Sequence, residues 1–181
     1  MKIYVLRHGK TELNKQKILN GQIDEPLAAE GVTYVQKIKI PTTIKYIYTS
    51  PLIRARQTAE LINYNVHAKL SIIDNLREVN MGSLAGKAWR NMENGEELKI
   101  KHRSIQYDYH DIGGESAEDV KTRVKDFLQK INNQHKDYEA LIVTHGGIIR
   151  VMHLLDRKEA LVDEVENVSL RIFEIDKIID K

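Results

Sequence analysis

Short runs of β-branched and aromatic residues alternate with longer segments of helical periodicity along this chain. Residues 3–6 form a β-rich run at the start, and residues 27–40 carry apolar side chains at helical spacing. Consecutive strands joined through helices pair in parallel, because a parallel connection needs a crossover of about a dozen residues or more. We therefore predict an α/β fold, a three-layer α/β/α sandwich with a mostly parallel central sheet.

The rest of the chain continues this alternation. Further strands are predicted at residues 44–49, 69–73, 140–144 and 168–175. Helices are predicted at residues 52–62 and 146–155, and also after Ser116, where Ser116 and Asp119 resemble a capping box. In open sheets of this kind ligands bind at the carboxyl ends of the strands, so the chemistry is expected there.

One domain accounts for the whole length, residues 1–181. A chain of this size, with 41% hydrophobic residues, can bury a sizeable core. The sequence contains no cysteine, which excludes thiol nucleophiles, disulfides and cysteine-based metal sites. The net charge is only +2, because 28 Lys and Arg oppose 26 Asp and Glu, and this balance argues against a nucleic-acid partner.

Location and assembly follow from apolar patterning. The apolar run at residues 3–6 is too short for a secretory signal or a membrane span, so we expect a cytoplasmic protein with no membrane partner. No long apolar edge is recognisable, which favours a monomer or a weak homodimer.

Three predicted strands end next to residues that carry a positive charge or an imidazole ring. His8 follows the first strand with Arg7 before it, Arg54 lies one turn into the helix after the second strand, and His145 follows the strand at 140–144. Two arginines and two histidines at one edge of a sheet would hold a tetrahedral dianion. The free N–H groups of the helix that begins near Gly146 would add to this binding.

Each of these features also has an ordinary structural explanation. A histidine beside an arginine is often a hydrogen-bonded surface residue, Arg54 could be a helix-face charge, and Gly146-Gly147 could be a turn. Their joint placement at strand ends is what favours a shared anion site. The remaining histidines show no metal-ligand spacing, so neither a metal nor a cofactor is expected.

Short motifs along the chain match those of one enzyme family, and they occur in the family's order. The motifs are LRHGKT (6–11), SPLIRARQTA (50–59), the spaced residues Leu76, Glu78, Gly82 and Gly86, then GGES (113–116) and THGG (144–147). The first loop and helix add Asn14, Gly21, Asp24, Pro26, Leu27 and Gly31. The chain therefore resembles the histidine phosphatase, or phosphoglycerate mutase-like, superfamily from residue 2 to about residue 175.

The resemblance implies a role for each residue at the strand ends. His8 would be the nucleophile and would carry the phosphoryl group as phosphohistidine. Arg7, Arg54 and His145 would hold the phosphoryl oxygens. Prepositioned cations and backbone donors would stabilise the transition-state charge there without a metal ion.

Glu78 is the candidate general acid under the same resemblance. An alkoxide leaves poorly unless it is protonated, and a carboxyl group beside a bound dianion keeps its proton near neutral pH. A structural ion pair with Arg77 is the alternative for Glu78. Asp74, Glu115 and Asp119 are weaker candidates, and Asp119 is better explained as a charge at a helix start.

Four residues are expected to line the entrance and bind substrate: Thr11, Asn14, Gly21 and Gly146. Turn and cap chemistry explains them equally well. Residues 82–114 are expected to form an insert that covers the site and selects the alcohol portion. Candidate contacts in the insert, for most of which a solvated helix face is the alternative, are Trp89, Arg90, Lys99, Lys101, Arg103, Tyr107 and Tyr109.

The sequence as a whole predicts a metal-independent phosphomonoesterase, a histidine acid-type phosphatase. It would hydrolyse a small phosphorylated metabolite through phosphohistidine on His8 and release inorganic phosphate. One alternative is a phosphoglycerate mutase, for which the chain offers little sequence for a closing lid. A third reading is the small protein-phosphohistidine phosphatase branch of the family, which resembles a version with a shorter segment around the motif that contains Glu78. The fourth is a non-catalytic module that binds a phosphorylated ligand.

Overall fold

The central sheet has five strands in the order β3-β2-β4-β1-β5 in the computed structural model, which describes residues 1–179. The strands are β1 (Lys2–Arg7), β2 (Tyr46–Thr49), β3 (Lys69–Ile72), β4 (Ala140–Thr144) and β5 (Leu170–Glu174). The pairs β1–β4, β2–β4 and β2–β3 are parallel, whereas β5, an outer strand of the sheet, runs antiparallel to β1. The prediction of a mostly parallel sheet is confirmed.

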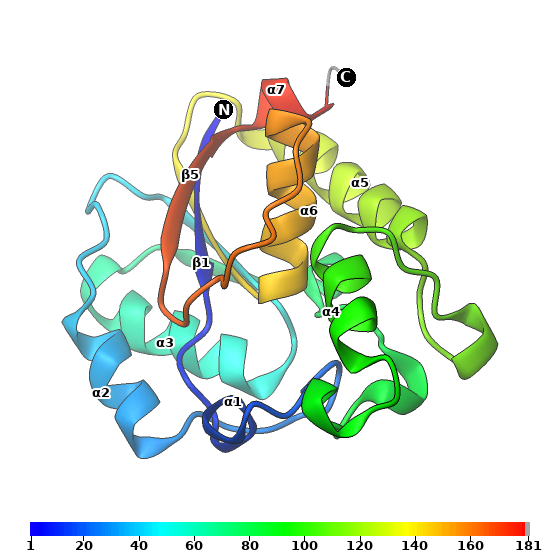
Figure 1. Cartoon of the computed structure of the whole chain (residues 1–181). Helices are drawn as coiled ribbons and strands as arrows, with labels where there is room; N and C mark the ends of the chain where they lie inside the picture. Colours follow the sequence, from blue (N-terminus) through cyan, green and yellow to red (C-terminus); the bar gives the residue numbers. More distant parts are fainter. Residues whose placement is uncertain (180–181) are drawn as a thin grey trace.

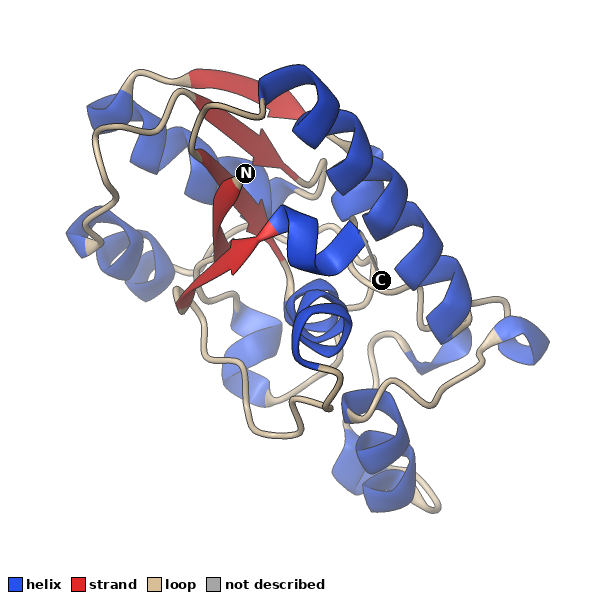
Figure 2. Cartoon of the chain, turned by 90° about the horizontal axis from the view of Figure 1, so that it is seen from above, coloured by secondary structure: helices blue, strands red, loops and turns tan. Residues whose placement is uncertain are grey.

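Helices cover both faces of this sheet (Figure 2). The helices are α1 (Glu12–Gln16), α2 (Ala29–Lys37), α3 (Ile53–Val66), α4 (Gly95–Arg103), α5 (Ala117–His135), α6 (Gly146–Arg157) and α7 (Ile175–Ile179). Side chains of α2 and α3 share a buried cluster with one face, and side chains of α5, α6 and α7 share a second cluster with the other. The chain therefore has the predicted α/β/α layers.

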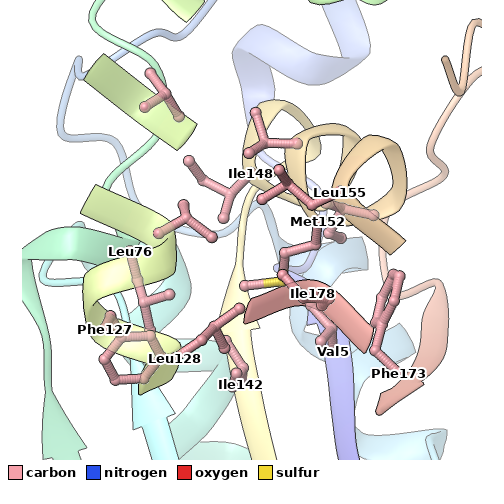
Figure 3. Packing of buried hydrophobic residues seen from close by; sticks show 14 of the residues in the cluster. Val5, Leu76, Phe127, Leu128, Ile142, Ile148, Met152, Leu155, Phe173 and Ile178 are labelled. Atoms are coloured by element: carbon pink, nitrogen blue, oxygen red, sulfur yellow. The ribbon is translucent and has the colours of Figure 1, made fainter. Parts of the chain in front are cut away.

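The larger core lies between the sheet and the pair α5 and α6. Leu128 of α5 and Ile148 and Met152 of α6 pack with Val5 of β1 and Ile142 of β4, and all five side chains are fully buried (Figure 3). Apolar residues at helical spacing on α5 and α6 thus meet continuous apolar runs in the two central strands, as expected for a sheet buried on both faces. This packing fixes the start of α6 against the end of β4.

Most of the predicted boundaries differ from the structure by one to four residues. Strand β4 matches its prediction, but the last strand ends at Glu174, because α7 takes over from Ile175. The helix predicted at residues 52–62 begins at Ile53 and continues to Val66. Helices α1 and α4 were not predicted, since each is short and mostly polar and shows no apolar stripe.

The parallel pairing brings three strand ends to one edge of the sheet. β4 pairs with β1 on one side and with β2 on the other. In this register Arg7 lies opposite Thr144, and Thr49 lies opposite Val143. The residue that follows each strand therefore leaves the sheet at the same edge, and α1 and α4 lie beyond it (Figure 1).

Residues 82–114 form a cap at this edge, built from α4 and three short 3-10 helices. Its interior is an aromatic stack in which the ring of His102 lies 5.1 Å from that of Tyr107 and 5.9 Å from that of Trp89. His102 Nδ1 lies 3.1 Å from the Tyr109 hydroxyl. Burial, together with the nearby Arg150, lowers the pKa of His102 to about 3.

No helix within residues 1–179 combines the length and the apolar character that a bilayer crossing requires. The cytoplasmic location stays a prediction.

Replacing His102 with phenylalanine is expected to flatten the acid side of the stability profile. Folding lowers the pKa of His102 from its ordinary 6.5 to about 3, so between these values only the unfolded chain binds the proton. Stability is therefore complete above the ordinary pKa and falls as the pH drops, by at most ~1.4 kcal/mol per pH unit for this histidine. Urea unfolding of both proteins from about pH 8 to pH 4 measures the difference, and a pH-independent difference would contradict the prediction.

Candidate active site

His8 lies directly after β1 and is only 2% exposed. Its Nδ1 is 2.7 Å from the carbonyl of Gly9, and Arg54 Nε donates to its Nε2 at 3.3 Å. A carbonyl only accepts and a guanidinium only donates, so the proton belongs on Nδ1 and the lone pair on Nε2. His8 is thus held as the tautomer whose Nε2 is unprotonated and carries the lone pair of a nucleophile.

The ring of His8 is also kept neutral. Burial, followed by the positive charges of Arg54 and Arg7, holds the pKa of His8 well below 6.5. The same burial and the charge of Arg54 hold the pKa of His145 well below 6.5. Both imidazoles therefore stay uncharged at neutral pH.

Arg54 is fully buried on the first turn of α3. Its Nη atoms donate to the carbonyls of Ile23, at 2.6 Å, and Gly21, at 2.8 Å. Burial lowers its pKa to about 10, which still leaves it charged at neutral pH. The loop before α2 therefore fixes the guanidinium against His8 without neutralising it.

Arg7, the last residue of β1, contributes a second cation. One of its Nη atoms donates to the carbonyl of Val165, and its Nε is buried with no hydrogen-bond partner among residues 1–179. Burial lowers the pKa of Arg7. An unpaired buried donor is costly, so an incoming anion would gain a strong hydrogen bond here.

His145 follows β4 and lies beside His8, with the ring centroids 5.0 Å apart. Its Nε2 is 2.8 Å from Ser50 Oγ, which accepts a hydrogen bond from the backbone N–H of Leu52. Ser50 can therefore direct its hydroxyl proton to Nε2, which places the ring proton of His145 on Nδ1. Nδ1 is buried and has no hydrogen-bond partner in the described chain, so its N–H is an unsatisfied donor that an acceptor on a ligand can satisfy.

The carboxylate of Glu78 lies at the start of α6. Its oxygens accept from the backbone N–H of Val79, at 2.9 Å, and of Gly147, at 3.3 Å. An ideal Cβ on Gly147 would lie 2.4 Å from Glu78 Oε1, so only glycine leaves room for the carboxylate. Glu78 makes no ion pair with Arg77, whose Nε pairs instead with Asp74 at 3.1 Å.

The weaker acid candidates have structural partners. Asp74 is exposed beside Arg77. Glu115 forms an ion pair with Arg123 at 2.8 Å and accepts a hydrogen bond from the backbone N–H of Asn80. Asp119 forms a capping box with Ser116 at the start of α5, as the sequence indicated. None of the three carboxylates lines the cavity above His8.

A cavity of about 470 Å³ opens above His8, between the strand ends and the cap. Of the predicted substrate-binding residues, Asn14, Gly21 and Gly146 line it, whereas Thr11 is buried beneath as the N-cap of α1. From the cap, Trp89, Arg90, Lys99, His102 and Arg103 line it. Tyr107 and Tyr109 are buried behind His102, and Lys101 is exposed and paired with Glu97 at 2.7 Å.

Sequence reasoning did not single out Asn167, which contacts the candidate nucleophile from the loop before β5. Its Nδ2 lies 3.1 Å from the carbonyl of His8 and 3.1 Å from Asn14 Oδ1. The two ends of the chain meet here across more than 150 residues, and no local pattern signals that contact. Ser50 was part of the motif at 50–59 but was given no role of its own, although its hydroxyl makes the contact with His145.

The assembled groups suit an anion with three or four oxygens. The guanidiniums of Arg54 and Arg7 and the imidazole of His145 lie near the His8 ring, and the first residues of α6, Gly146 and Gly147, line the cavity above it. Arginines and helix N-termini are the usual ligands of phosphoryl groups in proteins. Within residues 1–179 no group of three or more histidine, aspartate or glutamate side chains is arranged to hold a metal ion.

The known proteins that this chain resembles carry the names of phosphoglycerate mutases and phosphatases. Phosphoglycerate mutase-like protein 4 of Arabidopsis thaliana is 30% identical over 96% of this chain and 79% of its own length. The metal-independent phosphoserine phosphatase of Arabidopsis thaliana is 28% identical over 94% of this chain and 74% of its own. The crystal structure of phosphoglycerate mutase from Thermus thermophilus superposes with a TM-score of 0.74, at 28% identity, and covers 95% of this chain and 92% of that one.

The family model that describes the histidine phosphatase superfamily (branch 1) matches residues 3–178. That range includes β1 from Ile3 onward, the other four strands in full and every residue of the candidate site. The chain belongs to the histidine phosphatase superfamily, branch 1.

Proposed function

We propose that this protein is a metal-independent phosphomonoesterase that hydrolyses a small phosphorylated metabolite through a phosphohistidine on His8. The observation that carries the proposal is the state of His8, which is buried, neutral and fixed by Gly9 with its Nε2 lone pair toward the cationic groups. The resemblance to a metal-independent phosphoserine phosphatase and to phosphatase-named relatives supports hydrolysis.

In the first step His8 Nε2 attacks phosphorus, and the bond from phosphorus to the ester oxygen breaks. Arg7, Arg54, His145 Nδ1 and the N–H groups of α6 hold the three equatorial oxygens, where charge accumulates. Glu78, at the start of α6, donates its proton to the leaving alkoxide. The products are the free alcohol, phosphohistidine and the Glu78 carboxylate.

In the second step a water molecule attacks phosphorus and the bond to Nε2 breaks. Glu78 takes a proton from that water, which restores its acid form and gives inorganic phosphate. His8 returns to the tautomer with its proton on Nδ1, because the hydrogen bond to Gly9 is kept throughout. Every proton is accounted for by Glu78 and water, so the sequence of steps needs no cofactor.

A mutase is the second candidate, because several relatives carry that name. A mutase must return the phosphoryl group to the product before water reaches it. With a labelled phosphoglycerate, label recovered in the isomeric ester would favour the mutase, whereas label recovered as inorganic phosphate would favour the phosphatase.

Hydrolysis of an aryl phosphate is expected to persist in the presence of a metal chelator and to fall to the uncatalysed level in the variant His8→Ala. The reason is that the nucleophile and the groups that stabilise the transition-state charge all belong to the protein chain. Phosphate release measures the rates, and acid quenching during turnover should trap acid-labile label on the wild-type protein only. Activity that requires added Mg²⁺, or label that persists in the variant, would contradict the mechanism.

The variant Glu78→Gln should lose much more activity on alkyl than on aryl phosphates. An alkoxide needs a proton in order to leave, whereas a phenolate leaves without help, so the alkyl rate should fall by roughly 100-fold or more. The measurement is kcat/KM for both esters in both proteins. Equal losses would remove Glu78 from the acid role.

The variant Gly147→Ala should reproduce this selective loss, because its methyl group would occupy the space of Glu78 Oε1. Misplacement of a catalytic group by about 1 Å costs roughly 100-fold in rate. Gly146→Ala is the matched comparison, since its Cβ would meet only Arg7, with Nε at 3.7 Å. A loss on alkyl phosphates as large in Gly146→Ala as in Gly147→Ala would show that the position of Glu78 is not the cause.

A further inference from the structure

Glu78 lies on a segment, residues 74–80, that contains neither a strand nor an α-helix. The segment begins with one 3-10 turn, Asp74–Leu76, and continues as a loop. The side chains of Leu76 and Val79 are fully buried, which anchors the segment to the core but does not set the direction of the Glu78 carboxyl group. A catalytic group must be held within about 0.5 Å of its working position, so the groups that fix this backbone bear on the reaction.

Arg123, on α5, donates hydrogen bonds to the backbone of this segment. Its Nη1 donates to the carbonyl of Asn75 at 2.6 Å and to that of Arg77 at 2.9 Å, and its Nη2 reaches the carbonyl of Glu78 at 3.4 Å. The amide of Asn75 returns a hydrogen bond, at 2.8 Å, to the backbone carbonyl of Arg123. These bonds fasten the segment that carries Glu78 to α5.

Glu115, which precedes α5, holds the far end of the same segment. Its carboxylate oxygens accept from Arg123, from Nε at 2.8 Å and from Nη2 at 3.1 Å. Oε2 also accepts from the backbone N–H of Asn80 at 2.8 Å, and the backbone N–H of Glu115 donates to the carbonyl of Asn80 at 2.9 Å. Glu115 therefore fixes both the segment and the guanidinium that binds it. We call Arg123 and Glu115 the acid clamp.

The guanidinium of the acid clamp uses all of its donors. An arginine has five N–H groups in a planar fork, and those of Arg123 make three hydrogen bonds to carbonyls of the segment and two to the Glu115 carboxylate. Their side chains are only 18% and 22% exposed, so water competes little for these bonds. Neither residue lines the cavity above His8, so the clamp reaches the substrate only through the segment that it holds.

Glu78 is consequently fixed at both of its ends. Its backbone carbonyl accepts from Arg123 Nη2 and from Gln22 Nε2, the latter at 3.0 Å. Its carboxylate accepts from the backbone N–H groups of Val79 and Gly147. Loss of the bonds on the backbone side would let the residue move while its carboxyl group stays in place chemically. Because a carboxylate balances the charge of Arg123, the clamp orients the segment without adding a free cation beside the acid.

We infer that Arg123 and Glu115 are positioning residues for the general acid, which hold the backbone of Glu78 so that its carboxyl group meets the leaving oxygen of the ester. The inference rests on the proposed function, with Glu78 as the acid. A positioning role predicts a loss confined to esters whose leaving group needs a proton. A purely structural role predicts equal losses on all esters.

The variant Arg123→Lys tests the inference, because lysine keeps the positive charge but lacks the planar fork. Its kcat/KM for propyl phosphate should fall by roughly tenfold, less than the cost of a full 1 Å misplacement because the buried side chains of the segment limit the movement. The loss should lie in kcat, with KM unchanged. Its kcat/KM for an aryl phosphate should change by less than about threefold, since a phenolate leaves without help.

Arg77→Lys is the matched control. It makes the same substitution on the segment itself, at a side chain that pairs with the exposed Asp74 and does not line the cavity. Both kcat/KM values should stay at the wild-type level. Glu115→Gln is the second test variant, should Arg123→Lys fail to fold in thermal unfolding, and it should show the same selective loss because it breaks the same clamp.

A double variant separates positioning of the acid from other effects. In the Glu78→Gln background, Arg123→Lys and Glu115→Gln should cause no further loss on propyl phosphate, because the acid that the clamp positions is already absent. If the clamp acted on folding or on phosphoryl binding instead, the losses in the two backgrounds would be equal.

Three results would overturn the inference while the proposed function stands: equal losses on both esters in the folded clamp variants, a loss on propyl phosphate as large in Arg77→Lys, or a full further loss in the Glu78→Gln background. Equal losses on both esters in Glu78→Gln itself would remove the acid and the clamp together, yet leave His8 as the nucleophile. If wild-type protein fails to hydrolyse even an aryl phosphate, the proposed function fails and the inference with it.

Discussion

The parallel pairing of β4 with both β1 and β2 is the constraint on which the rest of this structure depends. It places the ends of three strands at one edge, so that residues from three distant parts of the sequence emerge side by side. His8 and His145 come within 5.0 Å only because Arg7 lies opposite Thr144 in that register. A slip of one residue would turn each of these side chains to the other face of the sheet.

Burial then sets the charge state of the side chains that the strand ends bring together. Imidazole loses its charge in a low-dielectric site and becomes a nucleophile and a neutral donor, whereas guanidinium keeps its charge even when buried. The same burial therefore gives the two histidines and the two arginines opposite roles. Neutral rings beside permanent cations form a site that attracts a dianion and still offers a lone pair to phosphorus.

Sequence patterns predicted the sheet, its layers and the convergence of His8, Arg54 and His145, because these depend on strand and helix periodicity and on where each strand ends. The cap helix α4 and the loop at 161–165 escaped prediction, since polar segments without an apolar stripe carry no period. Contacts of Asn167 with His8, and of Ser50 with His145, also escaped it. They join residues that are 159 and 95 positions apart, and only the folded chain brings them together.

Hydrogen bonds to backbone groups, rather than ion pairs, hold most side chains of the candidate site in position. Arg54 is fixed by two carbonyls, Arg7 by one, His8 by the carbonyl of Gly9, and Glu78 by two N–H groups. A carbonyl orients a cation without cancelling it, so the full charge stays available for the substrate. It follows that the course of the loops at 20–23 and 161–165 matters more to the site than the side chains they carry. Substitutions there that preserve the backbone should be tolerated, whereas insertions should move the cations and disable the site even though every side chain of the site is retained.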